Sequence, residues 1–294
     1  ERRILEGQPT SYMATQVARR LLVDRQLDAA EIDLIIVATV TPDMPFPATA
    51  CVVQHQVAAS RAWAFDLSAA CTGFVFALVT AAQFIWSGVH RRVMVIGADK
   101  MSAITDPRDR ATCVLFGDGA GGVLLERGLD PEAGLVDFEL HADGAGAQFL
   151  AVPAGGSLAP ASEQTVAGRL HYVRQDGPAV FRFAVARMAE VSQSLLARNG
   201  CSAADLALFV PHQANQRIID AVAQRLGLGP DKVMSDIDRY ANTTAGTIPI
   251  ALSEAWEQGR LASGDLVLLA GVGAGYTWGS ALLRWGMQPA GVSS

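Results

Sequence analysis

The stretch that organises this chain is DLSAACTGF, residues 66–74, which carries a thiol at Cys71. Residues 62–65 before it are apolar and short, as in a strand, and residues 74–86 after it are apolar and long enough for a helix. Cys71 is therefore expected at a strand-to-helix turn, where unpaired N–H groups and the helix dipole favour thiolate and make it a candidate nucleophile. On position alone, a small buried apolar residue is the commoner role of an intracellular cysteine.

The composition narrows the class of protein. The 294 residues are 50% hydrophobic and 18% charged, which allows a large core, and the net charge of −6 argues against nonspecific nucleic-acid binding. The four cysteines form no C-x-x-C pair, so neither a zinc site nor a disulfide framework is predicted, and we expect reduced thiols in the cytoplasm. The apolar residues 74–86 are too few to cross a bilayer, and no signal peptide is visible.

Apolar runs and glycine or proline breaks predict alternating strands and helices. Runs that are apolar throughout indicate strands buried on both faces, and apolar residues at helical spacing indicate helices that cover them. The first half predicts helices over 12–23, 48–57 and 74–86, and strands over 34–38, 62–65, 93–97 and 122–125, the last after a glycine turn at 117–121. The second half predicts helices over 180–198, 216–226 and 248–257, and strands over 206–211, 266–270 and 276–283.

An internal repeat relates the two halves. Residues 28–37 match residues 202–211 in pattern, so the numbering offset between the halves is 202 − 28 = 174. The strand at residue 93 follows Cys71 by 93 − 71 = 22 positions, and the strand at residue 266 follows Asn242 by 266 − 242 = 24 positions. We therefore expect an α/β protein of two pseudo-symmetric halves, residues 1–133 and 134–294, with Cys71 and Asn242 at equivalent helix starts.

Two more residues are placed where α/β proteins hold ligands. His212 follows a predicted buried strand directly, although a histidine there can also be satisfied by its neighbours. Asn242 precedes a predicted helix, where capping is the commoner role of asparagine. Residues 271–275, GVGAG, lead into a strand and so predict a tight turn with exposed N–H groups, not a dinucleotide loop. Residues 145–168 are either a connector or a functional loop.

Five motifs together resemble one family. DLSAACTGF at 66–74, FGDGAG at 116–121, PHQAN at 211–215, YANTTAG at 240–246 and GAGYTWGS at 273–280 are similar to the β-ketoacyl-[acyl-carrier-protein] synthase III family of thiolase-fold condensing enzymes. The resemblance spans essentially the whole chain. It implies a five-layer αβαβα fold, an acyltransferase, and no metal or cofactor apart from coenzyme A thioesters as substrates.

The resemblance also implies a mechanism. Cys71 takes an acyl group from acyl-CoA, such as acetyl-CoA, and malonyl-[acyl-carrier-protein] then loses CO2 and attacks the thioester. The product is a 3-oxoacyl-[acyl-carrier-protein], which initiates type II fatty acid synthesis. His212 and Asn242 stabilise the enolate, and the backbone N–H groups of Cys71 and Ala274 hold the acyl oxyanion.

Further site residues follow from the same resemblance. It implies coenzyme contacts at Arg110, Asn215 and Arg217, an acyl pocket lined by Phe116, and a homodimer in which Phe46 reaches the neighbouring subunit's acyl pocket. A basic face for the acyl carrier protein would comprise Arg182, Arg217 and Arg225, each of which can also be a solvated surface charge. No nucleic acid or membrane partner is expected.

The start of the chain departs from the family pattern. Family members carry a first strand, and a segment with a Trp and an Arg that clamp adenine, before the position of Glu1. Without them a sheet edge would be unsatisfied, so we expect a further N-terminal segment that this sequence does not include or that is disordered. Two alternatives stay open: a specialised relative for polyketide or quinolone precursors or for acyl transfer to oxygen or nitrogen, and a noncatalytic binding subunit. The presence of both His212 and Asn242 favours decarboxylative condensation.

Overall fold

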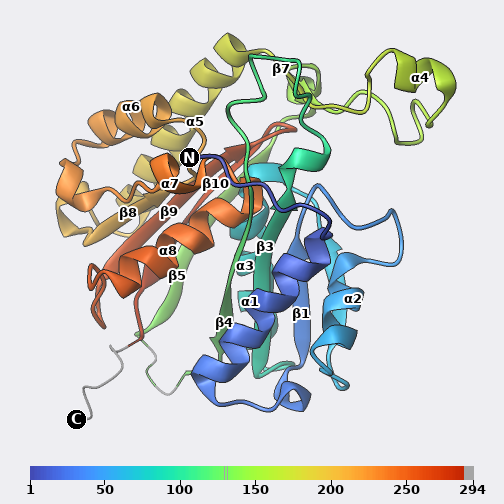
Figure 1. The fold of residues 1–294 in the computed structure, drawn as a ribbon. Helices are drawn as coiled ribbons and strands as arrows, with labels where there is room; N and C mark the ends of the chain where they lie inside the picture. Colours follow the sequence, from blue (N-terminus) through green and yellow to red (C-terminus); the bar gives the residue numbers. More distant parts are fainter. Residues whose placement is uncertain (129, 131, 288–294) are drawn as a thin grey trace.

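Two four-stranded sheets form the frame of the molecule in the computed structural model, which describes residues 1–128, 130 and 132–287. The first sheet has the strand order β2-β1-β3-β4 and the second the order β5-β10-β9-β8. Helices lie outside each sheet and between the two, as the ribbon in Figure 1 shows. The resulting sequence of layers is αβαβα, which is the predicted thiolase-like architecture.

The first sheet is built from the first half of the described chain. Its strand β1 pairs in parallel with β2 and β3, and β4 pairs antiparallel with β3. All five residues of β1 are buried, as its uninterrupted apolar run predicts. The strands are β1 (Leu34–Ala38), β2 (Trp63–Leu67), β3 (Arg92–Lys100) and β4 (Asp118–Glu126), covered on the outside by α1 (Thr10–Arg25) and α2 (Thr49–Gln56).

The second sheet repeats this plan. Its strand β8 pairs in parallel with β9, and β10 pairs antiparallel with both β9 and β5. The strands are β5 (Gly134–Ala142), β8 (Leu208–Pro211), β9 (Leu266–Gly273) and β10 (Thr277–Arg284), covered on the outside by α5 (Gly177–Arg198) and α6 (Gln216–Leu226).

The central layer consists of α3 (Gly73–Trp86) and α8 (Thr247–Glu257), whose apolar side chains join both sheets in one core. Alternation along the strands supplies the two faces of each sheet. Leu34 and Ile36 point into this central core, whereas Ile35 and Val37 pack against the outer helices. Burial of apolar surface on both faces, at roughly 25 cal/mol per Å2, is what holds the layers together.

Two glycines show how closely the halves approach each other. A Cβ on Gly97 of β3 would lie 2.2 Å from the carbonyl oxygen of Ala245, in the turn before α8. Its counterpart at 97 + 174 = 271 is Gly271 of β9, where a Cβ would lie 3.8 Å from the carbonyl oxygen of Cys71, in the turn before α3. Each half therefore packs its turn on a glycine of the other half.

Residues 145–168 were expected to be either a connector or a functional loop. They belong to the segment that joins β5 to α5. It contains the short strands β6 (Leu150–Ala151) and β7 (Arg174–Gln175), which pair antiparallel, and the short helix α4 (Glu163–Ala167). In Figure 1, α4 projects away from the layers at the upper right. Leu150 and Gln175 line the cavity described below, so part of this segment contributes to the site.

Three local predictions are wrong. Residues 117–121 are not a turn, because β4 begins at Asp118. The glycines of β4 allow α8 to pack closely on the strand; a Cβ on Gly121 would lie 2.8 Å from the backbone nitrogen of Ile250. Likewise, residues 271–273 are part of β9, and only residues 274–276 turn. Finally, Asn242 is not the equivalent of Cys71.

The correct equivalence follows from the helix starts. The helix α3 begins at Gly73 and α8 at Thr247, and 247 − 73 = 174 is the offset of the repeat. The same offset pairs Cys71 with Ala245 and places Asn242 three positions too early. Each helix follows a short 3₁₀ turn, Ala70–Thr72 or Thr244–Gly246, whose first residue has a positive φ of 48° at Ala70 and 55° at Thr244. The following strands obey the same offset, because β3 begins at Arg92 and β9 at Leu266, and 266 − 92 = 174. The near-match of 22 and 24 positions that paired Cys71 with Asn242 departs from this offset, which is why the pairing was wrong.

Candidate active site

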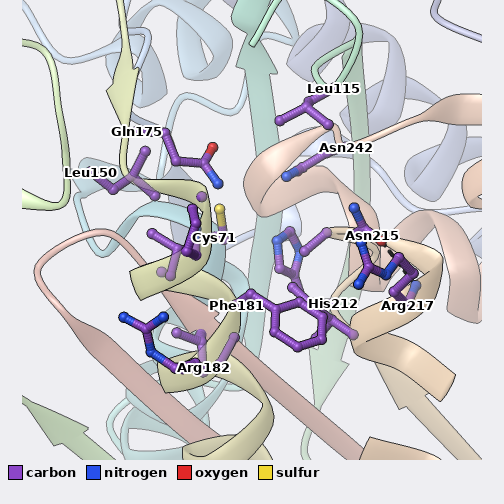
Figure 2. Close-up of a pocket in the computed structure, with 18 of the residues that line it drawn as sticks. Cys71, Leu115, Leu150, Gln175, Phe181, Arg182, His212, Asn215, Arg217 and Asn242 are labelled. Carbon is purple, nitrogen blue, oxygen red and sulfur yellow. Dashed lines mark hydrogen bonds between the residues drawn. The ribbon is translucent and has the colours of Figure 1, made fainter. Parts of the chain in front are cut away.

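A cavity of about 490 Å3 lies where the two halves meet, and its wall includes Cys71, His212 and Asn242. Each comes from a different element: Cys71 from the turn before α3, His212 from the residue after β8, and Asn242 from the segment before α8. Figure 2 shows the three side chains directed toward a common space. Residues separated by 242 − 71 = 171 positions in the chain thus form one site.

Cys71 is held in a tightly packed turn and is 6% exposed. Gly273 of β9 lies against it, since a Cβ there would come within 2.9 Å of both the Cys71 nitrogen and the Ala69 oxygen. Neither Cys71 nor Ala274 donates its N–H to a backbone carbonyl among the residues that the structure describes. Neither N–H group therefore has a backbone partner in this part of the chain, and the role of the two as an oxyanion pair stays a prediction.

The thiol of Cys71 is not poised as a thiolate. Burial, together with the Asp99 carboxyl, raises the pKa of Cys71 to about 12. The expectation that the helix start lowers this pKa is wrong for the described structure, because desolvation of the thiolate outweighs the local N–H groups. The thiol is protonated at neutral pH, so it must lose its proton in the course of any attack.

His212 is 2% exposed, and burial lowers its pKa to about 3, so that the imidazole is neutral at physiological pH. Its Nδ1 lies 2.7 Å from Oγ1 of Thr247, the first residue of α8. With Nδ1 engaged, Nε2 is the nitrogen left to face the cavity. The backbone of His212 is fixed by a 2.8 Å hydrogen bond from its N–H to the carbonyl of Ala270.

Asn242 has its amide orientation determined by the backbone beside it. Its Oδ1 accepts the N–H of Thr244 at 2.9 Å, so the Nδ2 group points the other way, into the cavity, as Figure 2 shows. Its own N–H donates to Leu115 and its carbonyl accepts from Gly117, both at 3.0 Å. Asn242 therefore presents a hydrogen-bond donor beside His212, which capping alone would not require.

Asp99, at the end of β3, was not among the predicted site residues. It is fully buried, and its oxygens accept from the N–H groups of Val40 at 2.8 Å and Ala245 at 3.2 Å, and from the hydroxyl of Thr39 at 3.0 Å. Burial raises its pKa to about 6. Asp99 ties the loop after β1 to the turn before α8, and no sequence signal other than its place at a strand end marks it.

Gln213 and Asp236 link the two segments that carry His212 and Asn242. Gln213 is fully buried; its Nε2 donates to the carbonyls of Pro211 at 2.8 Å and Met234 at 3.2 Å, and its Oε1 accepts the N–H of Asp236 at 3.0 Å. The carboxyl of Asp236 is 1% exposed, its Oδ2 has no partner among the described residues, and burial raises its pKa to about 7. The segment before Asn242 is thus anchored on the residue after His212.

The structure places some of the other predicted residues in the cavity wall and some outside it. Phe116, Arg182, Asn215 and Arg217 line the cavity, whereas Arg110, Ala274, Phe46 and Arg225 are not among its lining residues. Asn215 also caps α6, because its Oδ1 accepts the N–H of Arg217 at 2.9 Å. The guanidinium of Arg217 lies 5.4 Å from the ring centre of Phe181, which holds it at the cavity mouth.

Sequence reasoning missed several lining residues. They are mainly apolar or aromatic and come from elements distant in the chain, including Leu115, Leu150, Gln175, Phe181 and Tyr276. In Figure 2, Leu150 and Gln175 lie on the opposite side of the cavity from Arg217, and Leu115 lies above Asn242. The cavity wall therefore combines two exposed cationic side chains, Arg182 and Arg217, with a largely apolar lining.

Metal-ligand clusters and membrane-spanning helices are both absent from residues 1–128, 130 and 132–287. No three His, Cys, Asp or Glu side chains of this part of the chain come together as a metal site would require. Its helices include none that is both long enough and apolar enough to cross a membrane.

Comparison with known proteins identifies the family. Residues 65–144 match the family model 3-oxoacyl-[acyl-carrier-protein] synthase III, and residues 196–285 match its C-terminal domain. The β-ketoacyl-[acyl-carrier-protein] synthase III of Chlorobium chlorochromatii is 56% identical over 288 residues, covering 97% of this chain and 88% of the relative. The chain belongs to the β-ketoacyl-[acyl-carrier-protein] synthase III family.

Other synthase III proteins agree with this assignment. That of Solibacter usitatus is 54% identical over 278 residues, which cover 94% of this chain and 84% of the relative. The crystal structure of the Aquifex aeolicus synthase III superposes with a TM-score of 0.89 at 43% identity, covering 97% of this chain and 87% of that chain. A priming β-ketosynthase from the R1128 polyketide pathway also superposes with a TM-score of 0.89, at 34% identity, covering 98% and 85%. These similarities confirm the predicted family and thiolase-like fold.

Proposed function

We propose that this synthase III family member transfers a primer acyl group from coenzyme A to Cys71 and condenses it with malonyl-[acyl-carrier-protein]. The product is a 3-oxoacyl-[acyl-carrier-protein], the first intermediate of type II fatty acid synthesis. The observation that carries this proposal is the convergence of a thiol and two side chains able to donate hydrogen bonds, Asn242 and His212, in one cavity. No step of this chemistry requires a metal or a redox cofactor.

The first step is acyl transfer. The Cys71 sulfur attacks the thioester carbonyl, its proton leaves, and the departing CoA sulfur takes up a proton, so that one thioester replaces another. Because the pKa of Cys71 is raised to about 12, attack and loss of the proton are coupled. The N–H groups of Cys71 and Ala274 stabilise the tetrahedral oxyanion, and one such donor typically contributes about 3–4 kcal/mol.

The second step is decarboxylation and carbon–carbon bond formation. The bond between the malonyl carbon and its carboxylate breaks, CO2 leaves, and negative charge develops on the thioester oxygen. The Nδ2 group of Asn242 and Nε2–H of neutral His212 donate to that oxygen. The enolate carbon then attacks the Cys71 thioester, and the Cys71 sulfur leaves and regains a proton.

The charged residues of the cavity wall suit the carrier of the substrate. Arg182 and Arg217 are exposed and line the cavity, and Asn215 lies next to Arg217. Cationic side chains there match the phosphate of phosphopantetheine and the acidic surface of a carrier protein. We extend the carrier face to Arg225 in the last turn of α6, and assign Arg110 to the coenzyme nucleotide, since its neighbours Ala111 and Thr112 line the cavity.

A homodimer is part of the proposal. Strand β2 is an edge of the first sheet, and Trp63 on it is 45% exposed, so a second copy would cover unpaired backbone and apolar surface. Phe46 is 84% exposed on the loop that precedes α2, and we assign it to the contact with a second copy. We place the protein in the cytoplasm, consistent with its free cysteines.

Acyl loading tests the proposal directly. Wild type and Cys71→Ala are incubated with acetyl-CoA and examined by intact-protein and peptide mass spectrometry, and malonyl-carrier protein is then added to follow CO2 release. We expect one acetyl group on Cys71 of the wild type and none on the variant. An adduct only with longer primers would favour a specialised relative, such as the polyketide priming enzyme; no adduct with any donor would favour a noncatalytic subunit.

A further inference from the structure

The hydroxyl of Thr247 stands between two acceptors and has one proton to give. Its Oγ1 lies 2.7 Å from Nδ1 of His212 and 3.0 Å from the carbonyl oxygen of Thr244. Thr247 and His212 are each 2% exposed, so water does not replace either contact. The direction in which this hydroxyl points therefore determines which nitrogen of His212 carries the ring proton.

Two arrangements satisfy the distances. If the hydroxyl donates to Thr244, it accepts from Nδ1–H, and Nε2 faces the cavity as a bare acceptor. If it donates to Nδ1, the ring proton is on Nε2, which faces the cavity as a donor. Only the second arrangement stabilises a developing enolate oxygen.

The backbone permits the second arrangement. The carbonyl of Thr244 already accepts the N–H of Thr247, so it keeps a partner when the hydroxyl donates elsewhere. Nδ1 of His212 has no hydrogen-bond partner other than this hydroxyl among the described residues, so Thr247 alone decides whether Nδ1 donates or accepts. The contact to Nδ1 is also the shorter of the two.

We propose that Thr247 is a positioning residue that donates to Nδ1 of His212 and thereby fixes the Nε2–H tautomer required for malonyl decarboxylation. This inference rests on the proposed donor role of His212. Because α8 begins at Thr247, the helix start itself carries the group that orients the imidazole. Acyl transfer to Cys71 does not use this donor and should be largely independent of it.

The tautomer is measured without any turnover. Long-range ¹H–¹⁵N correlation spectra of ¹⁵N-histidine-labelled protein, with His212→Asn to assign the resonances, distinguish protonated from unprotonated ring nitrogens. We expect a protonated Nε2 and an unprotonated Nδ1 in the wild type. A protonated Nδ1 would overturn the proposal, whatever the variants do, and this outcome is separate from any failure of acyl loading or condensation.

The variants provide a second measurement. Thr247→Val keeps the shape and removes the hydroxyl; we expect malonyl decarboxylation to fall on the order of 10-fold to 100-fold, acyl loading to stay within about 3-fold, and the KM for malonyl-carrier protein to change little. Thr247→Ser should restore decarboxylation and the wild-type spectrum. The matched control is Thr243→Val, because the buried hydroxyl of Thr243 has no partner among the described residues.

The pattern of losses decides the outcome. Equal loss of loading and decarboxylation in Thr247→Val would indicate a merely structural role, and undiminished decarboxylation would contradict the proposal outright. If Thr247→Val does not fold, as judged by circular dichroism, the wild-type spectrum and Thr247→Ser still test the assignment.

Discussion

The turn before α3 and the turn before α8 have the same backbone and different chemistry. Both are 3₁₀ turns that begin with a positive φ, and they occupy equivalent places in the two halves. The first turn carries Cys71, and the same place in the second is Ala245. The second half instead supplies His212 and Asn242, at positions that correspond to 212 − 174 = 38, Ala38, and 242 − 174 = 68, Ser68. In the proposed mechanism, the first half thus supplies the nucleophile and the second half supplies the two hydrogen-bond donors.

The residues that contact the two turns also differ in chemistry. Asp99 accepts the N–H of Ala245 in the second turn, whereas the equivalent of Asp99, at 99 + 174 = 273, is Gly273, which packs against the nitrogen of Cys71. A carboxylate at residue 273 would compete for the N–H groups that an acyl oxyanion needs. The equivalent positions 99 and 273 therefore differ in side chain because they contact different turns: Asp99 binds the turn before α8, and Gly273 packs against the turn before α3.

The largest expected effect is on the rate of malonyl decarboxylation when a proposed donor of the second half is removed. His212→Ala and Asn242→Ala should each lower malonyl decarboxylation about 10²-fold to 10³-fold, because each removes a donor to the enolate oxygen. Acyl loading of Cys71 should change far less. The matched control Ser68→Ala, at the exposed position equivalent to Asn242, should leave both rates near wild type. Radiolabelled CO2 release and intact mass resolve the two steps, and equal losses in both would contradict this division of roles.

The next effect concerns Gly273. A methyl group added there meets the Ala69 oxygen and the Cys71 nitrogen at 2.9 Å, so Gly273→Ala should lower the free energy of unfolding by about 1–3 kcal/mol and slow acyl loading. Gly144→Ala is the control, since a Cβ at Gly144 meets nothing within 4 Å and its φ is not positive. Urea unfolding and acyl-loading rates measure both. A Gly273→Ala protein with wild-type stability and loading would show that the turn before α3 is less constrained than its packing indicates.

The smallest effect is a pH dependence in the segment before Asn242. Burial raises the pKa of Asp236 from its ordinary 3.8 to about 7. The folded state therefore binds this proton more tightly, so the stability linked to it is fully present below about pH 4 and is lost as pH rises through 7. Asp236→Asn should lose this dependence and exceed the wild type by on the order of 1–3 kcal/mol at pH 8, with no such gain at pH 4.

Thermal or urea unfolding between pH 4 and pH 8 provides the measurement. Asp238→Asn is the control, because Asp238 is exposed and close by in the same segment. A pH profile that Asp236→Asn leaves unchanged would mean that this carboxyl stays ionised in the folded protein.

Much of the fold was predictable because a strand buried on both faces has an uninterrupted run of apolar residues. The uninterrupted apolar runs at 34–38 and 266–270 each proved to be buried strands, and the offset that relates the two halves was visible in the letters. The glycines at 117–121 were misread because glycine marks both turns and close contacts. Here Gly121 faces α8, an element from the other half of the chain, and no local pattern reports that approach.

For the site, the residue types and their order determined the candidates. A cysteine at a strand-to-helix turn, a histidine directly after a buried strand and an asparagine before a helix are local features, and the motifs around them are specific to one family. The sequence also determined that two similar halves exist. The offset of 174 seen in the sequence already pairs Cys71 with Ala245; the pairing with Asn242 was wrong because it rested on a near-match of spacings, 22 and 24 positions, that departs from this offset.

Only the tertiary structure decided the ionisation and orientation of the site groups. The pKa of Cys71 depends on burial and on Asp99 from the end of β3, and the ring orientation of His212 depends on Thr247 at the start of α8. Desolvation and hydrogen bonding are properties of the packed environment, so they arise only when the two halves close on each other. The sequence therefore specified which atoms are available for chemistry, and the fold decided which of them carry protons and where those protons point.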